Sequence, residues 1–463
     1  MTMEFKGPAE AGEPVGARAE ATVPAAWPGF SIARLPRILF GGGTSGELGA
    51  VVREFGHRAL VVVRGPGFTD SPAWARIRAG LELAGVEVAL ESVSGEPSPT
   101  LVDGIVVRHR GSGSGSGPGS GSGSGPGSGP APFDVVVGIG GGSVLDTAKA
   151  VAGLLIPGNS VMDHLEGVGP ELPYRGPSVP FVAVPTTAGT GSEATKNAVL
   201  SVRGGRGFKK SFRHEMLVAR VAVLDPDLLA ACPPELIAGN GMDALTQLLE
   251  SYVSTKANPF TDALALSGLA AARDSLAVWF EEAQTDREAA GPNREAVDPD
   301  RGAEGPRRAA AVARERMAYA ALCSGICLAQ AGLGAVHGLA SPLGAGYPIP
   351  HGAACGATLV AATRVNIVAL EARDQGDRAL SRYAAAGRLF TGRAGANDRE
   401  ARSALVSALE SLAAFLGVLS LSTYGITESS IPALVADSRG SSMKTNPVLL
   451  TDEEIAAILR ASL

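Results

Sequence analysis

The stretch PFDVVVGIGGGSVLDTAKA, residues 132–150, decides the fold of this chain. It begins as a valine and isoleucine run typical of a buried β-strand, stops at consecutive glycines and continues with residues that favour a helix. Glycines at such a turn let the backbone approach a ligand, and the N–H groups that open the helix face an anion. The stretch therefore predicts a phosphate cradle at Gly141, Gly142 and Ser143, although Ser143 and Asp146 also fit an ordinary helix cap.

A second loop, VPTTAGTGSEATKNAVL at residues 184–200, follows another hydrophobic strand end. Its hydroxyl side chains stand on a backbone that glycines keep flexible. Such a loop can hydrogen-bond a ribose, a phosphate or a nicotinamide amide without adding charge, although on its own it also fits a polar turn. Its candidate cofactor contacts are Thr186, Thr187, Thr190 and Ser192.

A third group of residues has the chemistry of a metal site. Asp243 and Gln247 lie four residues apart in GMDALTQ and share one face of a helix, while His337 and His351 are separated by glycines and prolines. One carboxylate, one amide oxygen and two imidazoles suit a first-row divalent cation with an open position for substrate. The spacing alone leaves open that the four are ordinary polar residues of helices and loops.

Strand-like and helix-like segments alternate through the first half of the chain. The expected strands are RALVVVRG (58–65), DVVVGIG (134–140), FVAVPTT (181–187) and RVAVLDP (220–226). From PPELIAG onward the sequence becomes rich in alanine and leucine at helical spacing. These patterns predict an α/β dinucleotide-binding domain with a parallel sheet at 29–226, an all-helical metal and substrate domain at 227–463, and an active site in the cleft between them.

Three segments fall outside this plan. Residues 1–28 are rich in Ala, Gly, Pro and Glu and are expected to be a disordered tail. Residues 111–130, GSGSGSGPGSGSGSGPGSGP, have the composition of a flexible linker inserted before the cradle strand. Residues 285–308 are charged and contain prolines and glycines, so an exposed loop is expected. No catalytic role is assigned to any of the three.

Composition limits the classes of function. The chain has 463 residues, 45% hydrophobic content and a formal charge of −6, which allows two domains with hydrophobic cores and argues against a nucleic-acid partner. No stretch reaches membrane-spanning length without glycine, proline or charge, and no secretory signal opens the sequence, so a cytoplasmic protein without a membrane partner is expected. The four cysteines form no CxxC pair; Cys323 and Cys327 share a helical face and are interpreted as core residues.

Together, and in this order, the three motifs resemble the iron-containing (group III, metal-dependent) alcohol dehydrogenase family. The resemblance runs from FSIARLPRILFGGGT near residue 30 to SSMKTNPVLLTDEEIAAILRASL at the end. It implies the dehydroquinate synthase-like architecture of that family, a homodimer, NAD or NADP, and a divalent metal ion, with Fe²⁺ first and Zn²⁺ or Mn²⁺ as alternatives. By position Asp243, His337 and His351 match metal ligands, and the cradle and hydroxyl-loop residues match cofactor contacts.

Two residues depart from the family pattern. Gln247 stands where the family usually has histidine, and Ser341 stands where many members have a second histidine that assists a proton relay. An amide oxygen is a weaker donor than an imidazole, so affinity for iron or zinc should fall and tolerance of manganese should rise. The glutamine arrangement is similar to the maleylacetate reductase branch, some of whose members work without metal.

The resulting functional prediction is reversible hydride transfer between a nicotinamide cofactor and a small alcohol or its aldehyde or ketone, with the metal as Lewis acid. A second hypothesis is a metal-independent reductase of an unsaturated keto acid. The carboxylates of that substrate would bind Lys209, Lys210 and Arg213. A third is a non-catalytic nucleotide-binding protein whose metal site has decayed through Gln247.

One further prediction concerns the choice of cofactor. NAD-specific relatives carry an acidic residue at the end of the expected strand 58–65, where this chain has Arg64. A guanidinium cannot accept a hydrogen bond from a ribose hydroxyl, but it pairs with a 2′-phosphate. Arg64, together with Lys210 as a further cofactor contact, therefore predicts that NADP(H) is used at least as well as NAD(H).

Overall fold

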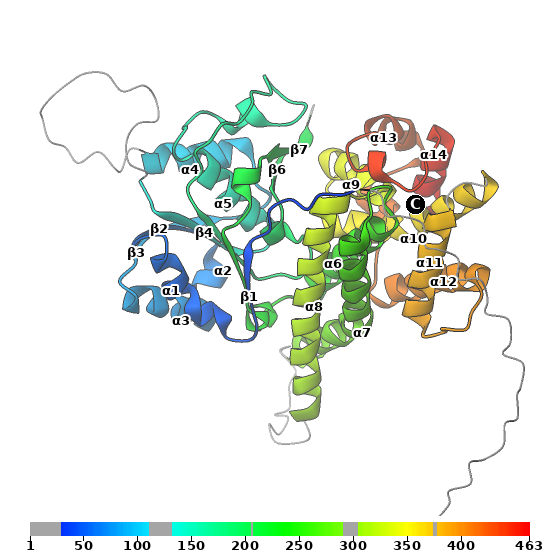
Figure 1. Cartoon of the computed structure of the whole chain (residues 1–463), viewed down its shortest axis with the longest axis horizontal. Helices are drawn as coiled ribbons and strands as arrows, with labels where there is room; N and C mark the ends of the chain where they lie inside the picture. Colours follow the sequence, from blue (N-terminus) through cyan, green and yellow to red (C-terminus); the bar gives the residue numbers. More distant parts are fainter. Residues whose placement is uncertain (1–28, 111–131, 205–206, 290–303, 374–376) are drawn as a thin grey trace, which may run out of the picture. The chain divides into compact units, whose positions relative to one another are not determined.

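A parallel sheet built around strand β4 (Val135–Gly140) organises the N-terminal half. The computed structural model describes residues 29–110, 132–204, 207–289, 304–373 and 377–463. Every residue of β4 is buried, as expected for a strand covered on both faces. Its neighbours are β2 (Arg58–Arg64) and β5 (Phe181–Pro185), and the full order is β1-β8-β5-β4-β2-β3 with parallel pairs throughout (Figure 1). The predicted parallel α/β fold is confirmed.

The sequence patterns predicted the four inner strands and missed the others. The inner strands are β2, β4, β5 and β8 (Val221–Leu224), all rich in buried valine. The two edge strands, β1 (Arg37–Phe40) and β3 (Glu87–Val93), are short or largely exposed and carry charged residues. A separate antiparallel hairpin joins β6 (Asn197–Val202) to β7 (Phe208–Arg213). Edge strands and hairpins need less apolar surface than inner strands, so hydrophobic runs do not reveal them.

Helices cover the two faces of the parallel sheet. On one face, buried side chains of α1 (Leu48–Arg53) and α3 (Pro72–Leu83) pack on the strands. On the other face, α4 (Pro99–Arg110) and α5 (Gly142–Leu154) do the same, and the short α2 (Pro66–Thr69) follows β2. Parallel strands all run in the same direction, so their carboxyl ends lie on one side of the sheet. The carboxyl ends of β2, β4 and β5 therefore lie on the side where the predicted cradle begins.

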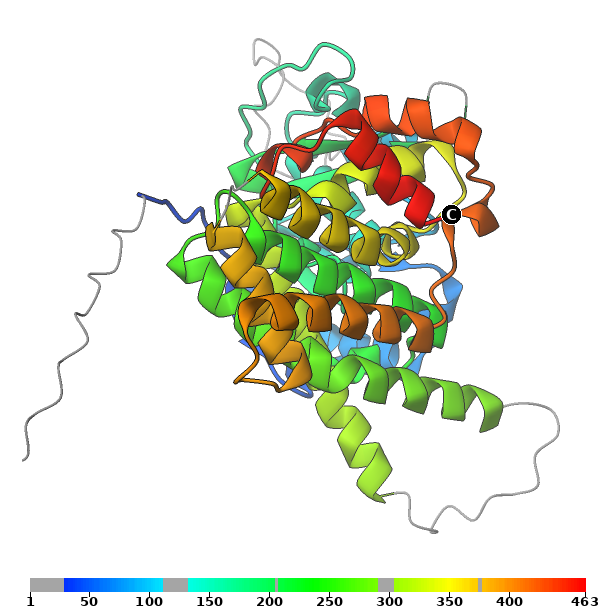
Figure 2. The ribbon, with the colours of Figure 1, turned by 90° about the vertical axis from the view of Figure 1, so that its right-hand side faces the viewer.

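Among the described residues after 227, every regular element is a helix. They are α6 (Pro234–Val253), α7 (Pro259–Ala289), α8 (Glu304–Ala331), α9 (Ala335–Gly346), α10 (His351–Ala372), α11 (Asp377–Thr391), α12 (Asp398–Phe415), α13 (Ile431–Asp437) and α14 (Asp452–Ala461). The helix α6 is almost wholly buried between α7, α8 and α10 and forms the centre of a second hydrophobic core (Figure 2). Residues Ser31–Leu463 form one compact unit that contains both halves.

The segment 285–308, expected to be an exposed loop, is helical at both of its described ends. The helix α7 continues to Ala289 and α8 begins at Glu304, so both ends of this segment are helical. The two helices pack along each other, and Arg314 of α8 pairs with Glu282 of α7 at 2.7 Å. This pair lies just outside the charged segment and joins the two helices. Residues 290–303, the tail 1–28 and the insertion 111–130 lie outside the described residues.

Two helices have the length and hydropathy of a membrane span, and both contain glycine and charged residues. They cover Pro259–Glu288 and His351–Ala372, and a bent pair formed by α8 and α9 also passes the same test. About 50% and 67% of their apolar windows are buried inside the protein. The apolar surface of these helices is therefore used to a large extent in the helical core.

Candidate active site

The residues predicted to form a phosphate cradle lie at the turn between β4 and α5. Gly141 is the N-cap of α5 in an extended conformation, and Gly142 opens the helix. A Cβ atom on Gly141 would lie 3.1 Å from the Thr187 hydroxyl, and one on Gly142 would lie 2.7 Å from the Thr190 methyl group. The glycines are therefore needed for the close approach of the two loops, and the free N–H groups that begin α5 form the anion-binding end of a helix.

Asp146 and Ser192 join the two loops. The Ser192 hydroxyl donates to Asp146 Oδ1 at 2.5 Å, and the backbone N–H of Val199 donates to Asp146 Oδ2 at 3.1 Å. The fully buried Lys149 ammonium donates to the Ser192 hydroxyl at 2.9 Å and to the Thr195 hydroxyl at 3.1 Å. Both carboxylate oxygens of Asp146 are thus engaged by the protein, so the geometry favours a supporting position for Asp146 and Ser192 beside the cofactor.

A single cleft of about 1810 Å³ brings the predicted motifs together. Its lining takes residues from the cradle, the hydroxyl loop, the β6–β7 hairpin and helices α6, α9 and α10. The predicted site residues that line it are Arg64, Gly141, Gly142, Ser143, Asp146, Thr187, Thr190, Ser192, Lys210, Asp243, Gln247, His337, Ser341 and His351. Thr186 does not line the cleft; its backbone N–H donates to Gly140 O at 3.0 Å and extends the contact between β5 and β4.

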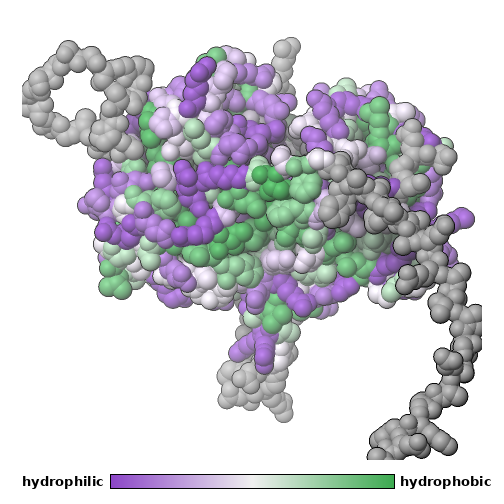
Figure 3. Space-filling model, viewed as in Figure 1, coloured by the Kyte–Doolittle hydropathy of each residue, from purple (hydrophilic) through white to green (hydrophobic). Residues whose placement is uncertain are grey.

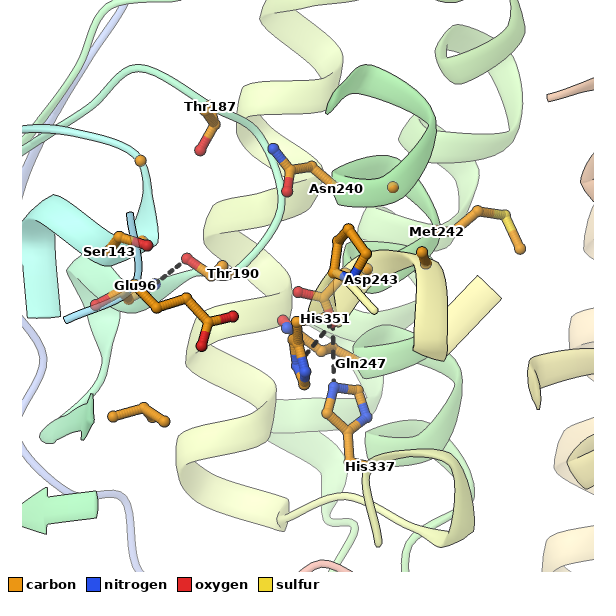
Figure 4. Close-up of a pocket in the computed structure, with 18 of the residues that line it drawn as sticks. Glu96, Ser143, Thr187, Thr190, Asn240, Met242, Asp243, Gln247, His337 and His351 are labelled. Atoms are coloured by element: carbon orange, nitrogen blue, oxygen red, sulfur yellow. Dashed lines mark hydrogen bonds and ion pairs between the residues drawn. The ribbon is translucent and has the colours of Figure 1, made fainter. Parts of the chain in front are cut away.

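The candidate metal ligands converge on the helical side of this cleft (Figure 4). Asp243 projects from α6, His337 from α9, and His351 is the first residue of α10. Asp243 Oδ1 lies 3.1 Å from His337 Nε2 and 3.8 Å from His351 Nε2. Three candidate donor groups from three helices thus lie close together.

A second carboxylate orients His337. Glu250 Oε2 lies 2.7 Å from His337 Nδ1, and Glu250 Oε1 accepts the backbone N–H of Val336 at 2.7 Å. A histidine that gives its Nδ1 proton to a carboxylate presents the lone pair of Nε2. That lone pair faces an oxygen of Asp243 at 3.1 Å, and two electron-rich atoms this close need a positive charge between them, either a proton or a metal ion.

Electrostatics at the cluster agree with this requirement. Burial opposes the ionised form of Asp243, but His351 and the hydrogen bond with His337 outweigh burial and lower its pKa to about 2. Burial lowers the pKa of His351 to about 4, so its imidazole is neutral near pH 7. Burial also works against the charged form of His337, yet Cys355, Asp243 and Glu250 raise its pKa well above the ordinary value. Asp243 and His351 are therefore in the forms that bind cations, an anionic carboxylate and a neutral imidazole.

The fourth member of the cluster is a cysteine that the sequence patterns assigned no function. Cys355 lies one helical turn after His351, and its Sγ is 3.8 Å from His337 Nε2 and 3.9 Å from His351 Nε2. Ligand atoms of Asp243, His337, His351 and Cys355 all lie within 4.8 Å of one another. The spacing of four residues between His351 and Cys355 was the available signal, and it was overlooked because no second cysteine accompanies it.

Gln247 lies beside this cluster with its amide engaged by protein groups. Its Oε1 accepts a hydrogen bond from the Ser324 hydroxyl of α8 at 2.7 Å. A hydrogen bond between Gln247 and Asp243 is among the causes that lower the pKa of Asp243. Because a carboxylate accepts hydrogen bonds, this contact uses the amide NH₂ group.

The remaining predicted residues lie around the cofactor side of the cleft. Arg64 ends β2, the neighbour of β4, and Lys210 is exposed on β7. The Ser341 hydroxyl donates to Lys209 O at 3.3 Å and so joins α9 to β7. Lys209 Nζ lies 3.8 Å from a carboxylate oxygen of Glu96, a lining residue that the sequence patterns did not single out (Figure 4).

A glycine turn at a helix start and a cluster of carboxylate, imidazole and thiol groups share one cleft, an arrangement typical of metal-dependent enzymes that bind a nucleotide. Comparison with known proteins agrees. Residues 128–226 match the family described as iron-containing alcohol dehydrogenase, and residues 307–463 match the C-terminal region of the same family. Alcohol dehydrogenase 4 of Saccharomyces cerevisiae strain YJM789 is 30% identical over 329 residues, which cover 70% of this chain and 72% of the yeast protein. Long-chain-alcohol dehydrogenase 1 of Geobacillus thermodenitrificans is 37% identical over 48% of each chain.

Solved structures give the same result. A crystal structure of a 1,3-propanediol oxidoreductase superimposes with a TM-score of 0.75 at 27% identity, covering 94% of this chain and 100% of that one. A sulfoacetaldehyde reductase from Bifidobacterium kashiwanohense in complex with NAD+ gives a TM-score of 0.73 at 26% identity, with 94% and 98% coverage. The chain therefore belongs to the iron-containing alcohol dehydrogenase family. It is an oxidoreductase that uses NAD(H) and a divalent metal ion to interconvert an alcohol and its carbonyl compound.

Proposed function

We propose that Asp243, His337 and His351 hold the divalent metal ion and that the substrate oxygen binds at the open side of this cluster. The observation that supports the assignment is the convergence of the three donors in the cleft that also contains the cradle. When bound, the metal supplies Lewis-acid polarisation of the substrate oxygen, and the nicotinamide supplies or accepts the hydride. Fe²⁺, Zn²⁺ and Mn²⁺ all suit a site of mixed nitrogen and oxygen donors.

The cofactor side of the proposal rests on the two loops. The backbone N–H groups at Gly142 and Ser143 bind the pyrophosphate at the start of α5. The hydroxyls of Thr187 and Thr190 line the cleft between this helix and the metal cluster and orient the nicotinamide end (Figure 4). Asp146 holds the hydroxyl loop in position through Ser192 and Val199.

Proton transfer is proposed to use water in the cleft. The Ser341 hydroxyl already donates to the Lys209 carbonyl, which favours a role in joining α9 to β7 over a role in the relay. His351 is neutral near pH 7 because burial lowers its pKa to about 4, so it offers a nitrogen lone pair to the metal and does not act as a general acid. The open cleft gives water direct access to the substrate oxygen.

A substrate that carries an anionic group is a second candidate. Lys209, Lys210 and Arg213 all line the cleft, and the charge of Lys209 contributes to the low pKa of His351. Glu96 and Glu166 partly neutralise this group, at 3.8 Å from Lys209 and 3.1 Å from Arg213. A keto acid or sulfonated aldehyde would gain from the cations, whereas an uncharged aldehyde would not. The non-catalytic reading has no support, because the carboxylate and both imidazoles are in place.

The test combines metal analysis with turnover. Purified protein should contain about one divalent metal per chain and oxidise NADH with aldehydes, and the panel should include keto acids. His337→Ala should lose the metal and most of the turnover, because one of two imidazole donors is gone. His57→Ala is the matched control, since His57 is an exposed imidazole just before β2, at the sheet edge away from the cradle. Full activity in metal-free His337→Ala protein would contradict the assignment.

We also propose a homodimer. The strand β1 pairs with β8 on one side, and the backbone on its other side is an edge of the sheet. Figure 3 shows hydrophobic residues gathered in the middle of the viewed face, where β1 lies beside the upper part of α8. Light scattering should give twice the mass of the chain, and a monomer at micromolar concentration would contradict this proposal. A cytoplasmic location stays a prediction that cell fractionation tests.

A further inference from the structure

The fourth residue of the candidate metal site is a cysteine. Cys355 is fully buried on α10, on the helical face that it shares with His351. Its Sγ lies at nearly equal distances, 3.8 and 3.9 Å, from the Nε2 atoms of His337 and His351. A cysteine that merely filled a core would have no reason to face both candidate imidazole donors at once.

Gln247, which stands where the family usually has histidine, does not compete with Cys355 for the fourth ligand position. The Ser324 hydroxyl of α8 donates a hydrogen bond to Gln247 Oε1, and the NH₂ group of the same amide faces Asp243. A cation binds the amide through oxygen, and a donor NH₂ group cannot act as a ligand. Gln247 therefore orients the Asp243 carboxylate, and Ser324 fixes the orientation of Gln247.

The separations between the ligand atoms fit a tetrahedral cation. Zinc bonds of about 2.0–2.1 Å to nitrogen or oxygen and about 2.3 Å to sulfur, at tetrahedral angles, place neighbouring ligand atoms roughly 3.3–3.6 Å apart. The separations in the cluster are 3.1 and 3.8 Å between Asp243 Oδ1 and the two imidazoles, and 3.8 and 3.9 Å between the sulfur and the same imidazoles. Movements of a few tenths of an ångström would bring these four separations to the tetrahedral values, and every pair of ligand atoms in the cluster lies within 4.8 Å.

We propose that Cys355 is the fourth protein ligand of the metal ion and that this site selects zinc-like cations over Fe²⁺ and Mn²⁺. The inference rests on the proposed function, because it uses the same metal site. On binding, the sulfur–metal bond forms as the S–H bond breaks, and the proton leaves to solvent, so the electron pair stays on sulfur. One thiolate and one carboxylate then balance the two positive charges of the ion. Soft thiolate donors favour Zn²⁺, whereas Mn²⁺ favours oxygen ligands.

Catalysis remains compatible with four protein ligands. Some catalytic zinc sites expand to five ligands in the transition state, and Asp243, His337 and His351 line the open cleft. Full charge balance makes the ion a weaker Lewis acid than it would be with a neutral fourth ligand. The thiolate ligand therefore predicts tighter metal retention together with slower turnover per metal than a Cys355→Ala protein loaded at saturating zinc.

The experiment uses the full chain stripped of metal and loaded with Co²⁺. A cobalt–thiolate bond gives a near-ultraviolet charge-transfer absorption that nitrogen and oxygen ligands do not give. Wild type should show this band at one cobalt per chain. Cys355→Ser should bind cobalt without the band. Its zinc affinity should fall by at least roughly 10–100-fold, which is the cost of losing a residue that only hydrogen-bonds a metal ligand. Direct competition of zinc against manganese should favour zinc far more strongly in wild type than in Cys355→Ser.

Two controls separate the outcomes. Cys327→Ser should keep the band, because this buried thiol donates to Thr261 O at 3.4 Å, a bond that a serine hydroxyl can replace. Gln247→Ala should also keep it. Stoichiometric cobalt without a thiolate band in wild type would overturn the inference and leave the proposed function intact. Failure of wild type to bind any divalent metal would overturn both.

Discussion

Gly325 of α8 lies directly against Gly191 of the hydroxyl loop. Replacing Gly325 with alanine tests whether this contact positions the hydroxyl loop for cofactor binding. A Cβ atom on Gly325 would lie 2.3 Å from Gly191 O and 2.7 Å from Gly191 Cα, whereas ordinary contacts begin at 3.4 Å. Both opposing atoms belong to the backbone, and Gly191 is in the left-handed region with φ of 59°. The loop or the helix must therefore move by about 1 Å.

The size of the effect follows from two opposing terms. Alanine in place of glycine stabilises a helix interior by about 1 kcal/mol. Overpacking costs about 1–3 kcal/mol, and the contact with backbone atoms puts this case at the upper end. The net loss of about 2 kcal/mol should lower Tm by only about 2 °C, because the unfolding entropy of a chain of this length is large. The loop displacement should lower kcat/KM with NADH by on the order of 10–100-fold.

Steady-state kinetics and thermal unfolding of Gly325→Ala measure both effects. Gly305→Ala is the control on the same helix, because a Cβ atom there meets nothing within 4 Å, and this variant should match wild type. A Gly325→Ala protein with unchanged kcat/KM and unchanged Tm would refute the view that this glycine contact positions the hydroxyl loop.

Three further predictions follow from single contacts. Glu250→Gln keeps the size of the side chain but weakens the hold on His337 Nδ1, so metal affinity should fall by roughly 10–100-fold, measured by competition with a chelator. Burial raises the pKa of Glu193 from 4.5 to about 7, so the folded protein binds this proton more tightly than the unfolded chain. The resulting stability is present below pH 4.5 and is lost as pH rises through 7. The free energy of unfolding of wild type should therefore decrease by up to about 3 kcal/mol between pH 5 and pH 8, and Glu193→Gln should remove this decrease. A decrease of the same size in wild type and Glu193→Gln would contradict the prediction. Arg64→Asp should shift preference from NADP(H) towards NAD(H) in steady-state kinetics, and the assignment fails if the ratio of the two kcat/KM values does not change.

The sequence by itself determined the inner sheet and the chemistry of its loops. The valine-rich runs of β2, β4, β5 and β8 predict buried parallel strands because both faces must be covered. The glycine turn after β4 predicts an anion site because a helix start needs no other residue to present its N–H groups. These are local properties, and the structure confirms the α/β fold that they predict.

Tertiary structure alone decided which side chains meet. Asp243, His337 and Cys355 stand on three different helices, so their separations of a few ångströms depend on how α6, α9 and α10 pack and not on spacing within any one of them. Sequence spacing establishes only that neighbours on one helix, such as His351 and Cys355, share a face. The carboxylate of Glu250 behind His337 and the exact engagement of Gln247 likewise depend on contacts between remote segments. Local sequence patterns therefore predict the fold class, whereas the packing of the helices determines which side chains meet at the candidate metal site.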